Sequence, residues 1–159
     1  MTTNPGGPII LTLTEWAENN ISAIYKATTQ NAFNSAFNAF VADDAHITVN
    51  GHELTREKYR QLLQDQTGLE NENVTFSGAV GVLKKKDNSL GLAGNAGIFY
   101  KATGNLVNIR SLSPAPLRII TSSLNITVVQ VGTSETRVVS AVNQVVLTED
   151  SPNVLPTPQ

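Results

Sequence analysis

The sequence predicts an α+β domain in which a cone-shaped, curved antiparallel β-sheet wraps around three N-terminal helices. Two observations predict this fold class. Between residues 12 and 66, apolar side chains recur mainly at helical spacing, interrupted by one short alternating segment. Beyond residue 72 they follow a period of two, which is typical of strands, and the connections are too short for parallel crossovers.

The first two helices are predicted from capping residues and apolar stripes. Thr12 or Thr14 could cap the N-terminus of the first helix. Its buried stripe has the spacing i, i+4, i+7 and i+8, with Trp16 beside it, and consists of Ala17, Ile21, Ile24, Tyr25 and Thr28. The second helix should run from about Gln30 to Val41. Its aromatic face consists of Phe33, Phe37 and Phe40.

A β-hairpin and a third helix are expected next. The hairpin spans residues 45–54 and turns at Asn50-Gly51, a dipeptide that favours a two-residue turn. Thr55 should cap a helix that runs to Gln66, and Gly68 is a natural stop for it. The side chains that this helix should bury are Tyr59, Leu62, Leu63 and Gln66.

Strands are expected for the rest of the domain, over Val74–Leu83, Leu90–Tyr100, Leu106–Leu112, Leu117–Val131 and Thr136–Leu147. Turns should fall at Lys86–Ser89, Ala102–Asn105, Pro114–Pro116 and Gly132–Glu135. Several of these strands are apolar on both faces, whereas the helices can cover only one face. The other face is therefore expected to contact a second copy of the chain, which makes a homodimer.

Composition limits the number of domains and the classes of partner. The 159 residues suit one domain, expected at residues 12–148, with tails at 1–11 and 149–159. A net charge of −2 and a charged fraction of 15% predict no binding to nucleic acid or to a membrane surface. With no cysteine and two histidines, neither a thiolate nor a three-histidine metal site is possible, and no cofactor is expected. The chain has no signal-peptide pattern and no apolar run of membrane-spanning length, so a cytoplasmic location is expected.

A family resemblance rests on five segments. Phe40-Val41-Ala42-Asp43-Asp44-Ala45 leads into a hairpin with Gly51 in its turn, a helix covers Thr55–Leu63, and late strands contain Ser122–Val128 and Arg137–Val146. This order resembles the nuclear transport factor 2-like superfamily and, within it, the SnoaL-like branch. The resemblance implies a cone that dimerises through its sheet. The superfamily includes ketosteroid isomerases, polyketide cyclases, dehydratases and non-enzymatic binding proteins, so the function stays open.

Comparison with the ketosteroid isomerases points to two positions. Their first helix carries a tyrosine that donates to a developing oxyanion, and an ungapped count from Ala42 implies that Tyr25 holds this position. The apolar stripe also places Tyr25 inside, where its hydroxyl could meet a ligand oxygen, a backbone carbonyl or water. The carboxylate base of the isomerases would fall on Val49, so that proton shuttle is not expected.

Asp44 and His46 are the other candidates for proton transfer. Asp44 could equally be a solvated turn residue, and His46 faces away from the cone if Val49 faces into it. The residues expected to line a pocket in the cone are Trp16, Ile21, Val49, Tyr59, Leu63, Tyr100, Asn125 and Asn143. The last two, both amides, could instead pair with each other across neighbouring strands.

Three functions follow from these candidates. The first is binding of a small hydrophobic molecule in the cone pocket, favoured because apolar residues stand where related enzymes keep acids and bases. The second is a cyclase, isomerase or dehydratase in which Tyr25 polarises a carbonyl and Asp44 or His46 transfers a proton. The third is a structural or interaction homodimer whose cone is filled by its own side chains.

Overall fold

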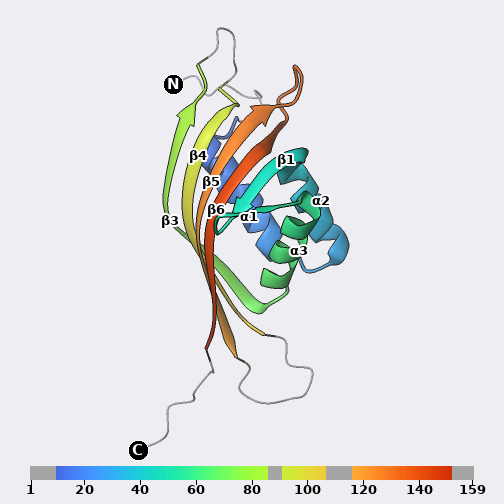
Figure 1. Ribbon diagram of the computed structural model, residues 1–159, viewed down its shortest axis with the longest axis vertical. Helices are drawn as coiled ribbons and strands as arrows, with labels where there is room; N and C mark the ends of the chain where they lie inside the picture. Colours follow the sequence, from blue (N-terminus) through green and yellow to red (C-terminus); the bar gives the residue numbers. More distant parts are fainter. Residues whose placement is uncertain (1–9, 86–90, 107–115, 152–159) are drawn as a thin grey trace, which may run out of the picture.

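The computed structural model describes residues 10–85, 91–106 and 116–151 (Figure 1). In these residues three helices lie against one face of a curved, unclosed, six-stranded sheet, which confirms the α+β class. The helices are α1 (Leu13–Lys26), α2 (Gln30–Phe40) and α3 (Arg56–Gln66). The strands are β1 (Val41–Val49), β2 (His52–Leu54), β3 (Glu70–Leu83), β4 (Gly94–Asn105), β5 (Leu117–Gln130) and β6 (Arg137–Ser151), in the order β2-β1-β6-β5-β4-β3.

Threonines cap all three of these helices. The Thr12 side chain accepts a hydrogen bond from the backbone N–H of Glu15, and the Glu15 carboxylate accepts one from the backbone N–H of Thr12, which forms a capping box. Thr12 is therefore the cap of α1 and Thr14 is not. Thr29 and Thr55 cap α2 and α3 in the same way, each through a backbone N–H three residues later.

The Asn50-Gly51 turn forms as predicted. Both residues have positive φ, 49° and 80°, as the two-residue hairpin turn requires. The Asn50 side chain also donates to the carbonyl oxygen of Val146 at 3.0 Å and accepts from its N–H at 2.9 Å. One residue thus makes the turn and fixes the β1–β2 hairpin to Val146 of β6.

The sheet differs from the prediction in one pairing. β1 pairs with β6 in parallel, whereas the other neighbouring strands are antiparallel. The chain between them passes through β2, α3, β3, β4 and β5, which is long enough for a parallel crossover. The predicted meander holds only from β3 to β6.

Several strand boundaries also differ, since β3 begins at Glu70 rather than Val74 and β4 begins at Gly94. Residues 102–105, predicted as a turn, are the last four residues of β4. A Cβ on Gly104 would lie 2.5 Å from the Cβ of Leu69, so this glycine permits close packing. Of the strand expected at Leu106–Leu112, Leu106 lies outside any strand and the rest falls outside the described residues. β6 extends to Ser151, beyond residue 148, where the domain was expected to end.

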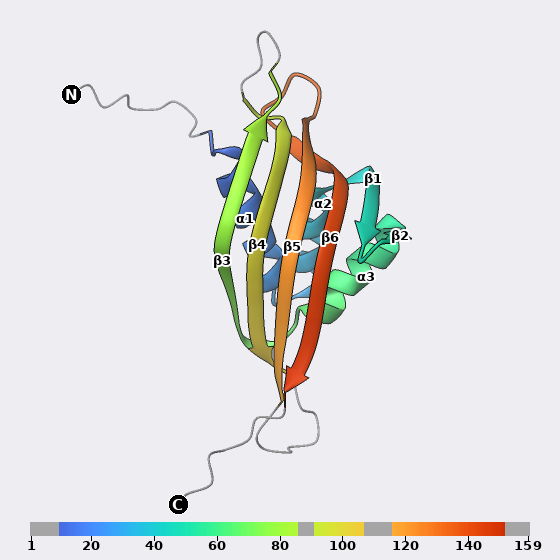
Figure 2. The same cartoon turned by 60° about the vertical axis from the view of Figure 1, so that its left-hand side comes forward.

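The core lies between the helices and the inner face of the sheet. Residues at every second position of β4 and β5 are buried there, from Ala96 to Ala102 and from Ile120 to Val128. Figure 2 shows the opposite, outer face, which no described element covers. Its large apolar side chains are between 37% and 65% exposed and include Val80, Val82, Phe99, Val129, Val145 and Leu147. Within the described part of the chain, no helix has the length and apolar character needed to cross a membrane.

Candidate functional site

All three tyrosines of the chain lie in one buried cluster. Tyr25 comes from the last turn of α1, Tyr59 from α3 and Tyr100 from β4, and each is 1% exposed. Helical periodicity brings the first two inward, and alternation along β4 brings the third. The cluster therefore joins the helical layer to the sheet at the centre of the cone.

Two buried glutamines connect the hydroxyls. Tyr25 donates to Gln66 Oε1 at 3.1 Å, and the Tyr25 and Tyr100 hydroxyl oxygens are 3.3 Å apart. Tyr59 donates to Gln144 Oε1 at 2.9 Å, and Gln144 Nε2 donates to Tyr100 at 3.2 Å. Gln144 Nε2 also donates to the Ser122 hydroxyl at 2.8 Å, where the chain of contacts ends. The hydroxyls thus have protein partners, as buried polar groups require.

Burial keeps these tyrosines protonated. Removal from water raises the pKa of Tyr25 and of Tyr59 well above the ordinary value, and it also raises the pKa of Tyr100. Each hydroxyl therefore acts as a neutral group with one proton to donate. For Tyr25 that proton is directed at Gln66.

A recess of about 340 Å³ adjoins Tyr25. It lies where α1 ends and where the connection from α3 enters β3. Its lining consists of Tyr25, Lys26, Ala27, Thr28, Gly68, Leu69 and Glu72. Gly68 has a φ of 77°, so it ends α3 and turns the chain back across this opening. The recess thus brings together the ring of Tyr25, the apolar side chains of Ala27 and Leu69, the hydroxyl of Thr28 and one side chain of each charge.

Glu72 is the unusual group of the recess. Its side chain is half-buried, and its Oε1 atom is inaccessible to water and has no hydrogen-bond partner. Burial raises the pKa of Glu72 to about 7. Glu72 and Tyr25 line the same recess, and the Glu72 carboxylate contributes to the raised pKa of Tyr25, whose main cause is burial.

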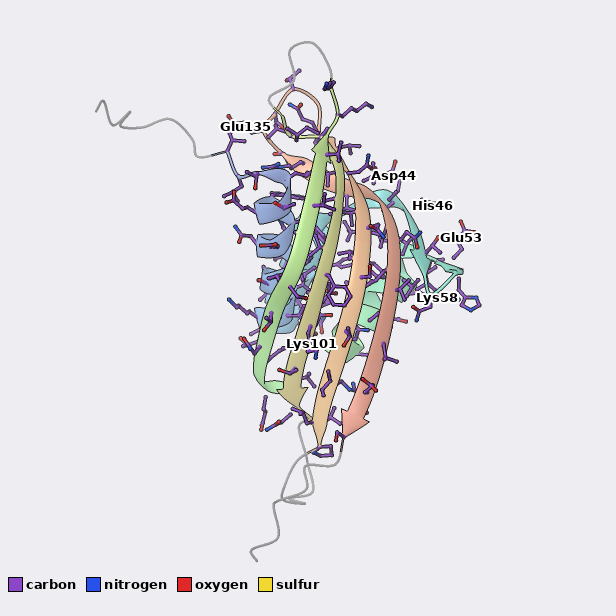
Figure 3. The ribbon with its side chains drawn as sticks, turned by 90° about the vertical axis from the view of Figure 1, so that its left-hand side faces the viewer. Asp44, His46, Glu53, Lys58, Lys101 and Glu135 are labelled. Atoms are coloured by element: carbon purple, nitrogen blue, oxygen red, sulfur yellow. The ribbon has the colours of Figure 1, made fainter. Side chains whose placement is uncertain are left out.

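The predicted proton-transfer residues do not meet Tyr25. Asp44 is exposed on β1, and the His46 side chain is 71% exposed, with its Nδ1 atom 3.3 Å from Glu53 Oε1 (Figure 3). Val49 is 6% exposed in the core, as predicted, so the carboxylate base is absent from that position. The structure thus does not bring Asp44 or His46 to Tyr25, because alternation along β1 turns Val49 inward and His46 outward.

Most of the predicted lining residues are packed in the core. Ile21, Tyr59, Leu63 and Tyr100 are at most 3% exposed and belong to one apolar cluster. Trp16 is half-buried, with its ring centroid 5.5 Å from that of Phe40, and the guanidinium of Arg137 lies over its ring. These contacts give each side chain a packing role.

Asn125 and Asn143 lie on the outer face of the sheet. They are direct neighbours across β5 and β6, and both are exposed. The expectation that they line a pocket in the cone is wrong, because their positions alternate with the inward-facing Leu124, Ile126 and Val142. With His46 and Thr48 they border a hollow of about 450 Å³ on the outer face.

Sequence reasoning missed Glu72, Ser122 and Gln144, and it listed Gln66 only as a buried residue. A signal for Glu72 existed, since it stands at period two before Val74 and Phe76, which pack against the core. No comparable signal marks Gln144, whose burial depends on the register of β6 after the irregularity in its pairing with Thr127 and Val128 of β5. In the described ranges, no three histidine, aspartate or glutamate side chains gather closely enough to hold a metal ion.

Comparison with known proteins identifies the fold. No protein-family model and no curated protein matches the chain. Among solved structures, the hexachlorocyclohexane dehydrochlorinase LinA (type 2) matches with a TM-score of 0.53 at 12% identity, over 91% of this chain and 93% of LinA. Mtr2 from Candida albicans matches with a TM-score of 0.54 at 8% identity, over 88% and 95%.

A third match is an NTF-2-like protein of unknown function from Pseudomonas aeruginosa, with a TM-score of 0.48 at 12% identity, over 84% of this chain and 94% of that one. LinA and Mtr2 both have the nuclear transport factor 2-like architecture. Identities this low bear on architecture alone. The chain therefore has the nuclear transport factor 2-like fold.

Proposed function

We propose that this chain binds a small, largely apolar molecule in the recess beside Tyr25. The observation that carries the proposal is the recess itself, with a volume of about 340 Å³. Small-molecule sites in proteins usually have volumes of about 300–1,000 Å³, mostly apolar walls and a few polar groups. Tyr25, Ala27 and Leu69 supply apolar surface here, and Glu72 supplies a polar group.

The proposal moves the ligand from the middle of the cone to its rim. The tyrosine–glutamine cluster and the core side chains occupy the middle, so Tyr25 reaches a ligand from the wall of the recess. LinA, as its name states, acts on hexachlorocyclohexane, a small apolar molecule, and it has the same fold. Assignment to the SnoaL-like branch is part of this proposal and rests on the segments quoted for it above.

Filling the recess tests the proposal. Titration with 2-naphthol, followed by its fluorescence, should give saturable binding. Ala27→Phe places a ring in the recess and should abolish that binding, whereas Ala23→Phe adds the same ring at an exposed position of α1 and should leave it intact. Absence of binding in the wild-type chain, or equal binding in both variants, would contradict the proposal.

We also propose that the chain forms a homodimer through the outer face of the sheet. This face carries exposed Val80, Val82, Phe99, Val145 and Leu147 and is uncovered by any described element. In Figure 3, which looks onto it, the labelled Asp44, His46, Glu53 and Lys58 lie beside the face on β1, β2 and α3, and Glu135 lies at its upper end. Lys101 of β4 lies on the face itself, in its lower part. A largely apolar face with few charges and a charged border is typical of protein interfaces.

A further inference from the structure

We propose that the two-fold axis of the homodimer lies along one row of residues that crosses the outer face of the sheet. The inference rests on the homodimer proposed above, because it names the contacts of that same interface. The row, called the central row, follows direct cross-strand neighbours from β1 to β3 and consists of Thr48, Asn143, Asn125, Gly97 and Val80. An axis on this row makes each of these residues face its own copy in the second chain.

Every member of the central row is compatible with its own copy. None of them is charged, so the axis brings no like charges together. Asn125 and Asn143 are exposed in the single chain and need hydrogen-bond partners once the face is covered. A side-chain amide carries both donors and an acceptor, so the same amide of a second copy can supply them. Gly97 leaves room for the Asn125 amide, whose Oδ1 atom lies 3.0 Å from the position that a Cβ would take there.

The rows on the two sides of the central row fit each other. On one side, Phe99 of β4 and Val145 of β6 project from the sheet and are 46% and 64% exposed. On the other side, Asn95 of β4 and Ala141 of β6 border the hollow of about 450 Å³. An axis on the central row exchanges the two sides, so Phe99 faces Asn95 of the second copy and Val145 faces its Ala141. The projecting side chains of each chain thus enter the hollow of the other.

Other positions of the axis suit the face less well. An axis through Phe99 would set Asn143 against Leu147 of the second copy and leave the amide without a partner. An axis through Lys101 would bring two ammonium groups together. An axis parallel to the strands, in the middle of the sheet, would set the valines of β3 over β2, whose Glu53 side chain is 71% exposed.

Cross-linking of single cysteines tests the position of the axis. The chain has no cysteine, so each variant carries one thiol. The thiol of Asn125→Cys lies on the axis, and a short bismaleimide should link it to its copy, since packed sheets are about 10 Å apart. Thr121→Cys is the matched control on the same strand and face, four residues away, so its two thiols would be about 26 Å apart. Denaturing gel electrophoresis should show at least tenfold more covalent dimer for Asn125→Cys than for this control.

Asn143→Cys, the second position on the axis, should cross-link as Asn125→Cys does, so the test does not depend on one substitution. Sedimentation velocity of the same chains at micromolar concentration separates the two ways to fail. Equal cross-linking at residues 121 and 125 in variants that sediment as dimers overturns the position of the axis and leaves the homodimer in place. A wild-type chain that sediments as a monomer overturns the proposed homodimer and this inference together.

Discussion

Gln144 connects the polar groups at the centre of the cone. Its Oε1 atom accepts from Tyr59, and its Nε2 atom donates to Tyr100 and to Ser122. All four residues are at most 1% exposed, so water cannot replace a lost partner. Removing the amide should therefore cost the desolvation of several groups rather than the strength of one hydrogen bond.

Gln144→Leu should lower the free energy of unfolding by about 2–4 kcal/mol, because it leaves two tyrosine hydroxyls and one serine hydroxyl without this partner. Urea unfolding followed by circular dichroism measures the change. Gln61→Leu, the same exchange at an exposed position of α3, should alter stability by less than about 0.5 kcal/mol. Equal effects of the two substitutions would show that the buried network contributes little.

Glu72 should make the fold less stable as the pH rises. Its pKa is about 7 in the folded chain and ordinarily 4.5, so the folded state holds the proton more tightly, and stability is lost between these two values. The full pKa shift corresponds to a loss of about 3 kcal/mol in the free energy of unfolding. Because part of the Glu72 side chain is exposed to solvent, we expect a loss of about 1–2 kcal/mol. Unfolding at pH 5 and at pH 8 should show this loss, and Glu72→Gln should abolish most of it. A loss of the same size in Glu72→Gln would assign the pH dependence to other groups.

Burial could be predicted at single residues, whereas polar partners could not. The helical stripe placed Tyr25 inside, and alternation along β1 placed Val49 inside and His46 outside, as the structure confirms. The partners of the Tyr25 hydroxyl, Gln66 and Tyr100, are 41 and 75 residues away in the chain. Spacing rules relate residues within one element, so they cannot bring such distant groups together.

Elements with local signals formed as predicted. The capping threonines and the Asn50-Gly51 turn act through contacts only a few residues away. The parallel pairing of β1 with β6 depends on residues about 95 positions apart, as in His46 with Ala141, and has no local signal. Gly104 was misleading because it resembles a turn residue, whereas its role is to admit the Leu69 side chain.

The β3–β4 pair requires a residue without a side chain at position 94. A Cβ at this position would lie 2.2 Å from the Val82 carbonyl oxygen and 2.9 Å from the Leu83 Cα, both backbone atoms of β3. Gly94→Ala should therefore separate the β3–β4 pair and destabilise the chain by about 2–3 kcal/mol. Gly78→Ala, where nothing lies within 4 Å of the added atom, should change stability by less than about 0.5 kcal/mol. Thermal unfolding of the two variants compares them directly, and similar midpoints would argue that β4 shifts to accept the methyl group.

The whole molecule has one covered and one uncovered sheet face. The helices cover the inner face, and the outer face keeps apolar side chains such as Val80 and Val145 about two-thirds exposed. The exposed edges of the hairpin carry charge, while the middle of the open face carries amides, hydroxyls and aliphatic groups. Burying such a face against a second copy costs little desolvation free energy, because few charges are removed from water.

Val145→Lys should convert the proposed dimer to a monomer. Val145 is 64% exposed on β6, opposite Ser123 of β5, so a lysine there would place an unpaired ammonium group inside the interface. Sedimentation velocity at micromolar concentration should show a dimer for the wild-type chain and a monomer for the variant. Ala23→Lys, which adds the same charge on the exposed side of α1, should stay dimeric. A wild-type chain that sediments as a monomer at this concentration would rule out the proposed interface, because this face is the apolar surface on which the proposed dimer depends.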